Sequence, residues 1–411
     1  MRMASSKGGC VVAVSLITIE HVPIADLRPD PANPRRISDA ELEALTRSIK
    51  EFGLLDPIIA RREDRTVIGG HQRLLAARRL GLKAVPVVYV DVSPEQARVL
   101  NLALNRISGE WDQELLARLL AELQEAPGVD ISLSGFADDE IAKLLKSLDA
   151  RDKRDRPEAF DFDAAWEAAT ADPGVKRGDV WLLGDHRLMC GDSADTGDVA
   201  RLMAGQTATV MVTDPPYGVA YEPEGRKRKR PIANDDLGAG QAEFWTLAFS
   251  AWPLEGDAYV FSPSGPLIQT LCASIVAAGI EHHQWLIWAK DRLVLGHSHY
   301  HYRHEHIFYG WRGKTSWQGS RKEDSVWDED RPQASPQHPT MKPVALCGRA
   351  IENSSATDDV VAEPFLGSGT TLIAAERTGR RCYAMEIDPR YCRVAIARWE
   401  AFTGERAERE G

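Results

Sequence analysis

Three features are scarce or missing in this sequence of 411 residues, and each absence argues against a class of protein. Only six cysteines occur and no two form a C-x-x-C pair, so neither a disulfide framework nor a zinc knuckle is indicated, and we expect a reducing cytoplasm. No apolar run approaches the roughly 20 residues that a membrane-spanning helix needs. The formal net charge is −11, which argues against a protein that coats DNA through overall charge but is compatible with a local basic groove.

The chain divides into four stretches of different composition, and its length predicts two or three domains. The stretch 16–92 mixes short strands with helices, and 93–148 is helical with a leucine stripe typical of ordinary packing. The stretch 149–159 is charged and nearly free of apolar residues, which predicts a linker. The stretch 160–404 alternates strands and helices and is the largest predicted domain.

A helix in the first stretch is predicted from its start signal. Ser38-Asp39-Ala40-Glu41 has the spacing of a capping box, in which the Ser38 side chain and the Glu41 side chain satisfy each other's backbone N–H groups. Apolar residues follow at helical spacing, and Gly53 is predicted to end the helix.

The largest domain contains several apolar, β-rich runs separated by helical stretches. This alternation predicts a largely parallel sheet with crossover helices, an α/β fold, preceded by a smaller α+β domain and the helical connector. The predicted strands are TVMVTD (209–214), DAYVFSP (257–263), HQWLIWAK (283–290), DDVVAEPF (358–365) and RCYAMEID (381–388).

The first motif with chemical content is Asp214-Pro215-Pro216-Tyr217, directly after a predicted strand. Open α/β sheets bind ligands at the carboxyl edge of the strands, where this motif would lie. Pro216 fixes its own φ and restricts Pro215, so the neighbouring groups are held still. A carboxylate and a backbone carbonyl can both accept hydrogen bonds from one NH₂ group, and Tyr217 offers a face for stacking. A simple turn is the alternative interpretation.

The second motif is Glu363-Pro364-Phe365-Leu366-Gly367-Ser368-Gly369-Thr370-Thr371, between a predicted strand and a predicted helix. Its glycines permit a tight turn and close approach of a ligand, and a helix N-terminus favours negative charge. The next strand ends in Glu386 and Asp388, where dinucleotide folds hold ribose hydroxyls. No lysine precedes the threonines, which disfavours a phosphate-binding P-loop, so a nucleoside-cofactor site is indicated.

Together these residues resemble the amino-methyltransferases of DNA. In that family D-P-P-Y is the catalytic motif and F-x-G-S-G-T-T is the cofactor loop. The family's beta group places the catalytic motif first, as here, and has an H-P-T-x-K-P segment between them, matched by His338-Pro339-Thr340-Met341-Lys342-Pro343. The resemblance implies a Rossmann-like methyltransferase domain that takes S-adenosylmethionine as cofactor and double-stranded DNA as substrate.

The resemblance also implies roles for individual residues. The target base is flipped out of the duplex, and Asp214 and the carbonyl of Pro215 accept hydrogen bonds from its amine while Tyr217 stacks on it. Glu386 holds the cofactor's ribose, and Thr340 and Lys342 lie beside its methionine end. The implied catalytic residues are Asp214, Pro215, Pro216 and Tyr217, and the implied cofactor-binding residues are Asp192, Thr340, Lys342, Glu363, Phe365, Gly367, Ser368, Gly369, Thr370, Thr371 and Glu386.

At two positions the match to the methyltransferase family is weaker. The family usually has Asp before the Pro-Phe step where this chain has Glu363, which puts the contact of this carboxylate with the cofactor's amino group in doubt. Asp192, in Cys190-Gly191-Asp192-Ser193, is either a contact of the cofactor's adenine or part of an ordinary turn.

The histidine-rich stretch 296–306 invites a metal hypothesis. It lacks H-E-x-x-H or a similar spacing, so we predict no metal site. The family has a Y-x-x-x-H-E-like segment here, which makes Tyr302, His304 and Glu305 residues of the base pocket or of the fold.

The N-terminal stretch resembles the ParB N-terminal domain, also called ParB/sulfiredoxin-like, over about residues 16–110. Asn33-Pro34-Arg35 and Gly69-Gly70-His71-Gln72-Arg73 carry the resemblance. The box that is usually G-E-R-R in partition proteins, and helps bind a nucleotide there, reads Gly70-His71-Gln72-Arg73. The reactive cysteine of sulfiredoxins is missing, which disfavours reductase chemistry. A nucleotide site near Arg35, Gly70, His71 and Arg73 is one alternative, and DNA contacts or simple salt bridges of these arginines are the other.

We therefore predict a site-specific DNA methyltransferase, of restriction–modification or orphan type, with a ParB-like module for DNA binding or regulation. Adenine N6 is favoured over cytosine N4, because aspartate in the catalytic motif is commoner among adenine enzymes of the family. A different alternative is a nucleotide-switched ParB-like DNA-binding protein with an inactive methyltransferase half. The basic run 226–230 is either a solvated segment or a phosphate contact. Homodimerisation is common in the beta group, and the sequence leaves it open.

Overall fold

The computed structural model describes residues 18–105, 110–154, 156–217, 240–263, 265–294, 299–330 and 341–411. The chain forms two compact units, residues 1–148 and 149–411. In the described part of the chain no helix is long and apolar enough to cross a membrane.

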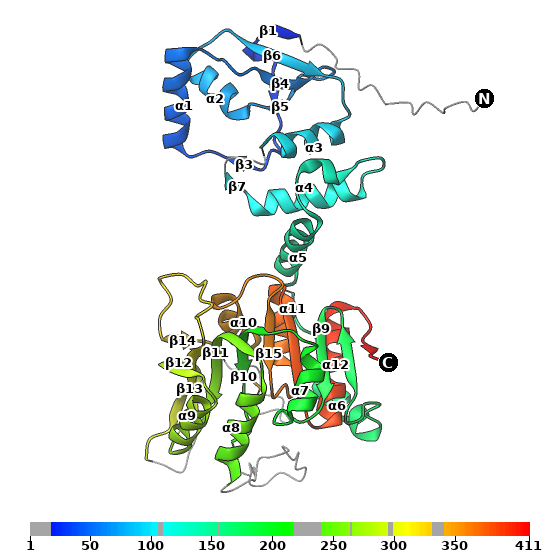
Figure 1. Ribbon diagram of the computed structural model, residues 1–411, viewed down its shortest axis with the longest axis vertical. Helices are drawn as coiled ribbons and strands as arrows, with labels where there is room; N and C mark the ends of the chain where they lie inside the picture. The colour runs from blue at the N-terminus through cyan, green and yellow to red at the C-terminus, as the bar shows by residue number, and fades with distance from the viewer. Residues whose placement is uncertain are drawn as a thin grey trace, which may run out of the picture. The chain divides into compact units, whose positions relative to one another are not determined.

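The N-terminal unit is built on a mixed sheet with two helices packed near it (Figure 1). Within the described residues the strand order is β1-β6-β4-β5-β2, in which β1 pairs antiparallel and β4 pairs parallel with β6. The elements are β1 (Ile19–Pro23), β2 (Arg28–Pro29), α1 (Asp39–Phe52), β4 (Ile58–Arg61), β5 (Thr66–Gly69), α2 (His71–Arg79), β6 (Ala84–Val90) and α3 (Pro94–Asn105). Helix α1 begins with the predicted capping box, since the backbone N–H of Glu41 donates to Ser38 Oγ and that of Ser38 donates to Glu41 Oε2.

The predicted helical connector consists largely of α4 (Gln113–Glu125) and α5 (Asp138–Arg154), with α3 before them. Its leucine stripe is packed, because Leu116, Leu119, Leu120 and Leu123 form one buried cluster with Val99 and Leu102 of α3. The stretch 149–159, predicted as a linker, is helical as far as Arg154, because α5 continues into it. Lys153 then pairs with Glu376 at 2.6 Å, and Arg156 donates to the Phe402 carbonyl at 3.1 Å, so the stretch packs on the C-terminal unit.

The C-terminal unit is built on one large sheet, whose described strands follow the order β14-β12-β13-β11-β10-β15-β16-β9-β8-β17. The five central strands, from β11 to β9, pair in parallel, whereas β13, β8 and β17 join antiparallel. The strands are β8 (Val180–Leu183), β9 (His186–Cys190), β10 (Ala208–Thr213), β11 (Leu254–Ser262), β12 (Glu281–Val294), β13 (Tyr302–Arg312), β14 (Val326–Asp328), β15 (Val360–Glu363), β16 (Arg381–Glu386) and β17 (Glu408–Arg409). All five strands predicted from sequence are present, and β8, β9, β13, β14 and β17 are additional.

Helices cover both faces of this sheet, which gives three layers (Figure 1). Alternate strand residues point to opposite faces. Val212 and Val361 therefore pack with α10 (Val344–Asn353), α11 (Thr370–Thr378) and α12 (Pro389–Thr403), whereas Met211 and Ala362 pack with α7 (Thr196–Met203), α8 (Gln241–Ala251) and α9 (Leu267–Ala277). Helix α6 (Phe162–Ala171) packs against α12 through Trp166 and Val394. The layering brings the carboxyl ends of β9, β10, β15 and β16 to one edge of the sheet.

Candidate active site

The backbone of the Asp-Pro-Pro-Tyr motif is fixed from α8. The motif leaves β10 at Asp214, and the carbonyl of Pro216 accepts hydrogen bonds from Gln241 Nε2 at 3.0 Å and from Trp245 Nε1 at 2.9 Å. Trp245 is fully buried, so this anchor is rigid. With Pro216 held in this way, the preceding carbonyl of Pro215 is the one left for another donor in the described structure.

The Asp214 carboxylate contacts two donors from the protein itself. Tyr217 OH donates to Oδ1 at 2.5 Å, and the buried ammonium of Lys342 donates to Oδ2 at 2.5 Å. Lys342 also lies 3.4 Å from Glu305, which pairs with Lys290 at 2.5 Å. Burial alone would lower the pKa of Lys342, but the charges of Asp214 and Glu305 outweigh burial and raise it, so the amine stays protonated.

The glycine loop forms a tight turn between β15 and α11. Gly369 is the N-cap of α11 at φ +89°, and a Cβ there would lie 3.2 Å from that of Ala395, so only glycine fits. Gly367 has φ +55° with no other atom within 4 Å of its Cβ position, which leaves this side of the loop open. The backbone N–H of Leu366 donates to the Met385 carbonyl at 2.9 Å and so ties the loop to β16.

Glu386 ends β16 beside this loop. Its Oε2 accepts from the backbone N–H of Gly367 at 2.8 Å, and its Oε1 accepts from that of Asp388 at 2.9 Å. Burial raises the pKa of Glu386 to about 7, against the lowering effect of these hydrogen bonds. Each carboxylate oxygen retains a second lone pair, so Glu386 can still accept from a ligand hydroxyl.

Glu363 lies beneath the loop and is 2% exposed. Its carboxylate accepts hydrogen bonds from Thr213 Oγ1, from Thr371 Oγ1 at 2.5 Å and from the backbone N–H of Phe365 at 3.0 Å. Burial raises its pKa to about 7. Glu363 therefore joins the end of β10 to the cofactor loop, and its oxygens already have protein partners.

The Gly-Asp-Ser turn after β9 lies at the same edge. The backbone N–H of Gly191 donates to the Glu386 carbonyl at 3.0 Å, and Ser193 Oγ donates to the Pro364 carbonyl. Asp192 Oδ1 accepts from the backbone N–H of Ala194 at 3.0 Å, which is a turn contact, and Oδ2 lies 3.8 Å from Arg177. Asp192 is thus next to both Glu386 and the glycine loop.

The remaining predicted loop residues mostly contact the protein interior. The Phe365 ring packs against Phe244 and Phe249, with ring centroids 5.9 and 6.3 Å apart. Arg398, buried and paired with Glu158, donates to the Ser368 carbonyl at 3.1 Å and to Thr370 Oγ1 at 3.3 Å. Thr340 lies outside the described residues, as does the basic run 226–230.

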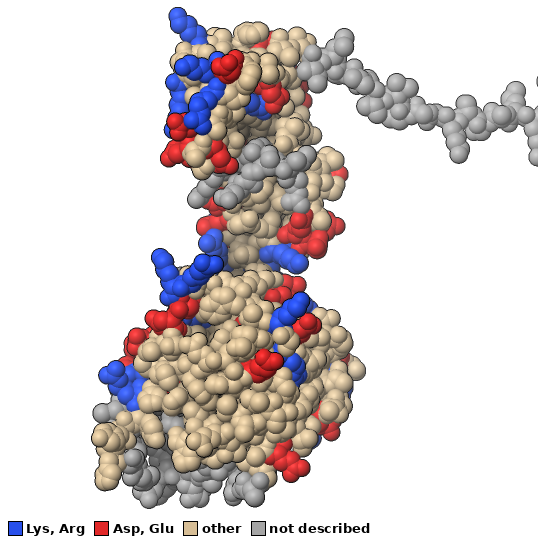
Figure 2. Space-filling model, turned by 60° about the vertical axis from the view of Figure 1, so that its left-hand side comes forward, with Lys and Arg blue, Asp and Glu red and all other residues tan. Residues whose placement is uncertain are grey.

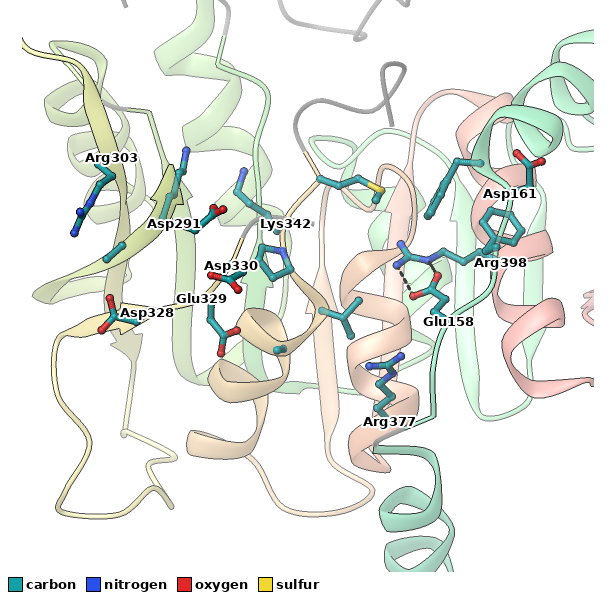
Figure 3. Close-up of a pocket in the computed structure, with 18 of the residues that line it drawn as sticks. Glu158, Asp161, Asp291, Arg303, Asp328, Glu329, Asp330, Lys342, Arg377 and Arg398 are labelled. Atoms are coloured by element: carbon teal, nitrogen blue, oxygen red, sulfur yellow. Dashed lines mark hydrogen bonds and ion pairs between the residues drawn. The ribbon is translucent and has the colours of Figure 1, made fainter. Parts of the chain in front are cut away.

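A cavity of about 1200 Å³ reaches this edge at Lys342 (Figure 3). Arg398 and Glu158 lie at one end of it and Arg303 and Asp328 at the other. The other described residues that were predicted for the site do not line this cavity. Figure 2 shows no continuous patch of described Lys and Arg on the face of the C-terminal unit that it presents.

In the N-terminal unit, Gly70 caps α2 at φ +94°, and a Cβ there would lie 3.2 Å from the Arg73 guanidinium. His71 Nε2 accepts from the backbone N–H of Asp30 at 3.2 Å, and burial lowers its pKa to about 4. Arg73 pairs with Asp56. His71 of the second ParB-like motif therefore contacts Asp30, which precedes the first motif in the chain, and the side chain of Arg35 lies outside the described residues.

The sequence analysis missed several residues of the site. Lys342 was predicted for the site, beside the cofactor's methionine end, and its ammonium lies on Asp214, a contact that the sequence did not predict. Gln241, Trp245, Lys290 and Arg398 have no motif around them, and only packing brings them to this edge.

The chain matches three family models over different stretches. They are the ParB N-terminal domain over residues 12–106, the ParB-methyltransferase HTH domain over 114–177 and the N6/N4 family of DNA methylases over 208–397. The second match spans α4, α5 and α6 and so includes the stretch 149–159.

Among curated proteins, stage 0 sporulation protein J of Bacillus subtilis (strain 168) is 32% identical over 139 residues, which is 33% of this chain and 46% of that protein. The type II methyltransferase M2.DpnII of Streptococcus pneumoniae is 32% identical over 118 residues, 28% of this chain and 41% of that protein. The chain thus spans less than half the length of either relative.

Among solved structures, the complex of M1.HpyAVI with SAM is 20% identical at a TM-score of 0.39, covering 50% of this chain and 95% of that one. The family matches, together with the two motifs at one sheet edge, identify an N6/N4 DNA methylase domain over residues 208–397 of a chain that also carries a ParB N-terminal domain.

Proposed function

We propose that this protein transfers a methyl group from S-adenosylmethionine to an exocyclic amine of a base in DNA. The observation that carries the proposal is the convergence of Asp214, the glycine loop and Glu386 at the carboxyl edge of one parallel sheet. This is where open α/β sheets bind ligands.

The cofactor half of the proposal is supported by the loop geometry. Gly367 leaves an open side, the N-terminus of α11 lies behind it, and Glu386 can accept ribose hydroxyls. Asp192 lies next to Glu386 and is the proposed contact of the adenine. When bound, S-adenosylmethionine supplies an activated methyl group.

The base half of the proposal is supported by the fixed motif. Asp214 and the Pro215 carbonyl would accept both hydrogens of the amine, which turns its lone pair toward the methyl donor. Because Gln241 and Trp245 hold Pro216, these acceptors are in place before the substrate arrives. Tyr217, half-buried beside Asp214, would border the flipped base.

We propose adenine N6 as the target and cytosine N4 as the alternative, since aspartate leads the motif as it does more often in adenine enzymes. The N-terminal unit is proposed to assist DNA binding or its control. A nucleotide site near Gly70, His71 and Arg73 is proposed as a second function, and the contact of His71 with the Asp30 backbone, just before the other ParB-like motif, supports it.

The test is methyl transfer from tritiated S-adenosylmethionine to duplex DNA by the full chain, followed by mass spectrometry of the nucleosides. N6-methyldeoxyadenosine is the expected product. N4-methyldeoxycytidine would replace the proposed target, and absence of label in DNA would leave the nucleotide-switched binding protein. Binding of labelled nucleoside triphosphates to the full chain, compared with its Arg73→Ala variant, tests the second function.

A further inference from the structure

The proposed catalytic carboxylate, Asp214, is paired with a lysine ammonium of the same chain. Lys342 Nζ lies 2.5 Å from Asp214 Oδ2, and the lysine is 8% exposed. Its aliphatic stem runs beside Phe261, with the ammonium 5.2 Å from the ring centroid. Tyr217 occupies the other oxygen. An incoming amine therefore meets an acceptor whose two oxygens already hold donors.

This arrangement opposes the proposed chemistry in two ways. An ammonium on Asp214 competes with the amine for the same acceptor. In addition, positive charge develops on the amine nitrogen as it takes the methyl group, and a second cation in a buried site repels that charge strongly. The reacting complex would gain from a shift of the Lys342 ammonium away from Asp214.

Glu305 offers the ammonium another position. Its Oε2 lies 3.4 Å from Lys342 Nζ and is a buried oxygen without a hydrogen bond in the described part of the chain. Its Oε1 is held by Lys290 at 2.5 Å, and the Lys290 ammonium lies 4.9 Å from the Trp288 ring centroid. Burial would raise the pKa of Glu305, but Lys342 and Lys290 together lower it, so this acceptor stays charged.

We propose that Glu305 is a positioning residue that draws the Lys342 ammonium off Asp214 when the target amine binds. In the free enzyme Lys342 is then bound to the Asp214 carboxylate, and it leaves that carboxylate when the base amine binds there. This inference rests on the proposed methyl transfer and adds the step that exposes Asp214. The other titratable groups that face the cluster are Tyr217, Lys290, Cys347 and Glu363.

A double-mutant cycle in the full chain tests the proposal. Glu305→Gln should lower kcat at least tenfold with an unchanged Kd for S-adenosylmethionine, because Lys342 is left on Asp214. In a Lys342→Met background the same substitution should change kcat by less than twofold, since no ammonium remains to be moved. Equal losses in both backgrounds, or no loss from Glu305→Gln alone, would overturn the proposal.

The pH profile separates this role from a merely structural one. Lys342→Met removes the cation that is paired with Asp214 and leaves Lys290 on Glu305, so the acid limb of kcat/KM should move to higher pH, whereas Glu305→Gln should move it lower or leave it in place. Lys153→Met removes another well-buried lysine, 2.6 Å from Glu376, and should leave the limb unchanged. Movement of the limb in the same direction in both cluster variants contradicts the proposal.

A crystal structure of the wild-type chain soaked with adenosine gives a readout that needs no turnover. We expect the amine on Asp214 and Lys342 Nζ on Glu305. An amine on Asp214 with Lys342 still in place overturns this inference alone. Adenosine absent from this edge, together with no methyl transfer by the wild type, overturns the proposed function and this inference with it.

Discussion

The carboxylate at the end of β10 and those at the ends of β15 and β16 have different kinds of partner. At the end of β10, Asp214 is paired with the ammonium of Lys342. At the ends of β15 and β16, Glu363 and Glu386 are held by hydroxyl and backbone N–H donors, with no ion pair to either among the described contacts, and burial raises the pKa of each to about 7.

The difference separates two uses of a carboxylate. A buried acid held only by neutral donors is half protonated near neutral pH and serves to join strand to loop. Asp214 instead pairs with an ammonium, which competes with a substrate amine for the same carboxylate. This difference supports the proposal that the β10 side carries the chemistry and the β15 and β16 side binds the cofactor.

The largest effect is expected on the β10 side. Asp214→Ala should lower kcat for methyl transfer by about 100-fold or more, because a preorganised acceptor for the reacting amine is lost. The Kd for S-adenosylmethionine should change less than threefold, since Asp214 lies outside the proposed cofactor contacts. Tritium transfer and calorimetry measure the two quantities, and near-normal turnover would remove Asp214 from the catalytic role.

A pH dependence of stability is expected from Glu363. Its pKa is raised from 4.5 to about 7 in the folded protein, so between these values the folded state binds a proton that the unfolded chain has lost. The free energy of unfolding should therefore fall as pH rises through this window, by on the order of 3 kcal/mol for this group.

Urea unfolding from pH 5 to pH 8 measures this effect. Glu363→Gln should make the free energy of unfolding depend less on pH. Part of the dependence should remain, because the pKa of Glu386 is raised in the same way. A variant whose stability falls as steeply as that of the wild type would show that Glu363 is charged throughout.

At pH 8, above the raised pKa of Glu386, Glu386→Ala should weaken S-adenosylmethionine binding by about 10- to 100-fold, because a hydrogen bond to a charged group contributes about 1.5–3 kcal/mol. Glu386→Gln, which keeps an acceptor for the Gly367 N–H, should lose less. Calorimetry of both variants provides the comparison. Identical Kd values for Glu386→Ala and the wild type would place the ribose elsewhere.

The smallest effect on the cofactor site is expected from removal of the N-terminal unit. A chain that begins at residue 149 should fold and bind S-adenosylmethionine with an unchanged Kd, and its DNA affinity should fall about tenfold, or roughly 1.4 kcal/mol, if the ParB-like unit contacts DNA. A gel-shift titration measures this loss, and unchanged DNA affinity would favour nucleotide sensing as the role of that unit.

A second truncation sharpens the domain boundary. A chain that begins at residue 160 also loses Lys153 and Glu158, which pair with Glu376 and with the buried Arg398. Leaving one buried charge unpaired costs about 3–5 kcal/mol, so this chain should melt at a clearly lower temperature than the one from residue 149. Equal melting temperatures would mean that the stretch 149–159 contributes no packing.

The sequence predicted those parts of the molecule that local rules determine. The apolar, β-rich runs predicted five strands, and the Ser38 capping box predicted the start of α1. The two motifs predicted residues that lie at the edge of the sheet. The strand β13 was not predicted, because its polar, histidine-rich start masks the alternation that its pairing with β11 and β12 enforces.

Residues brought to the site by packing could not be predicted in this way. The density of charged residues predicted a linker at 149–159. In the structure, however, the charged side chains of Lys153 and Arg156 bind partners more than 200 residues away. Similarly, Glu305 and Lys342 meet only because β13 and the start of α10 lie beside the same edge. Contacts of this range depend on topology, which local patterns do not encode.

The hydrogen bonds to the Pro216 carbonyl have a consequence for how the site can be altered. The chain leaves the motif at Tyr217 and is again within one hydrogen bond of it at Gln241, so the backbone of the motif is held by a helix that belongs to a later part of the sequence. Helix α8 therefore determines part of the geometry around Asp214, although none of its residues belongs to the motif. Gln241 and Trp245 are positions at which a substitution would alter the motif without touching it in sequence.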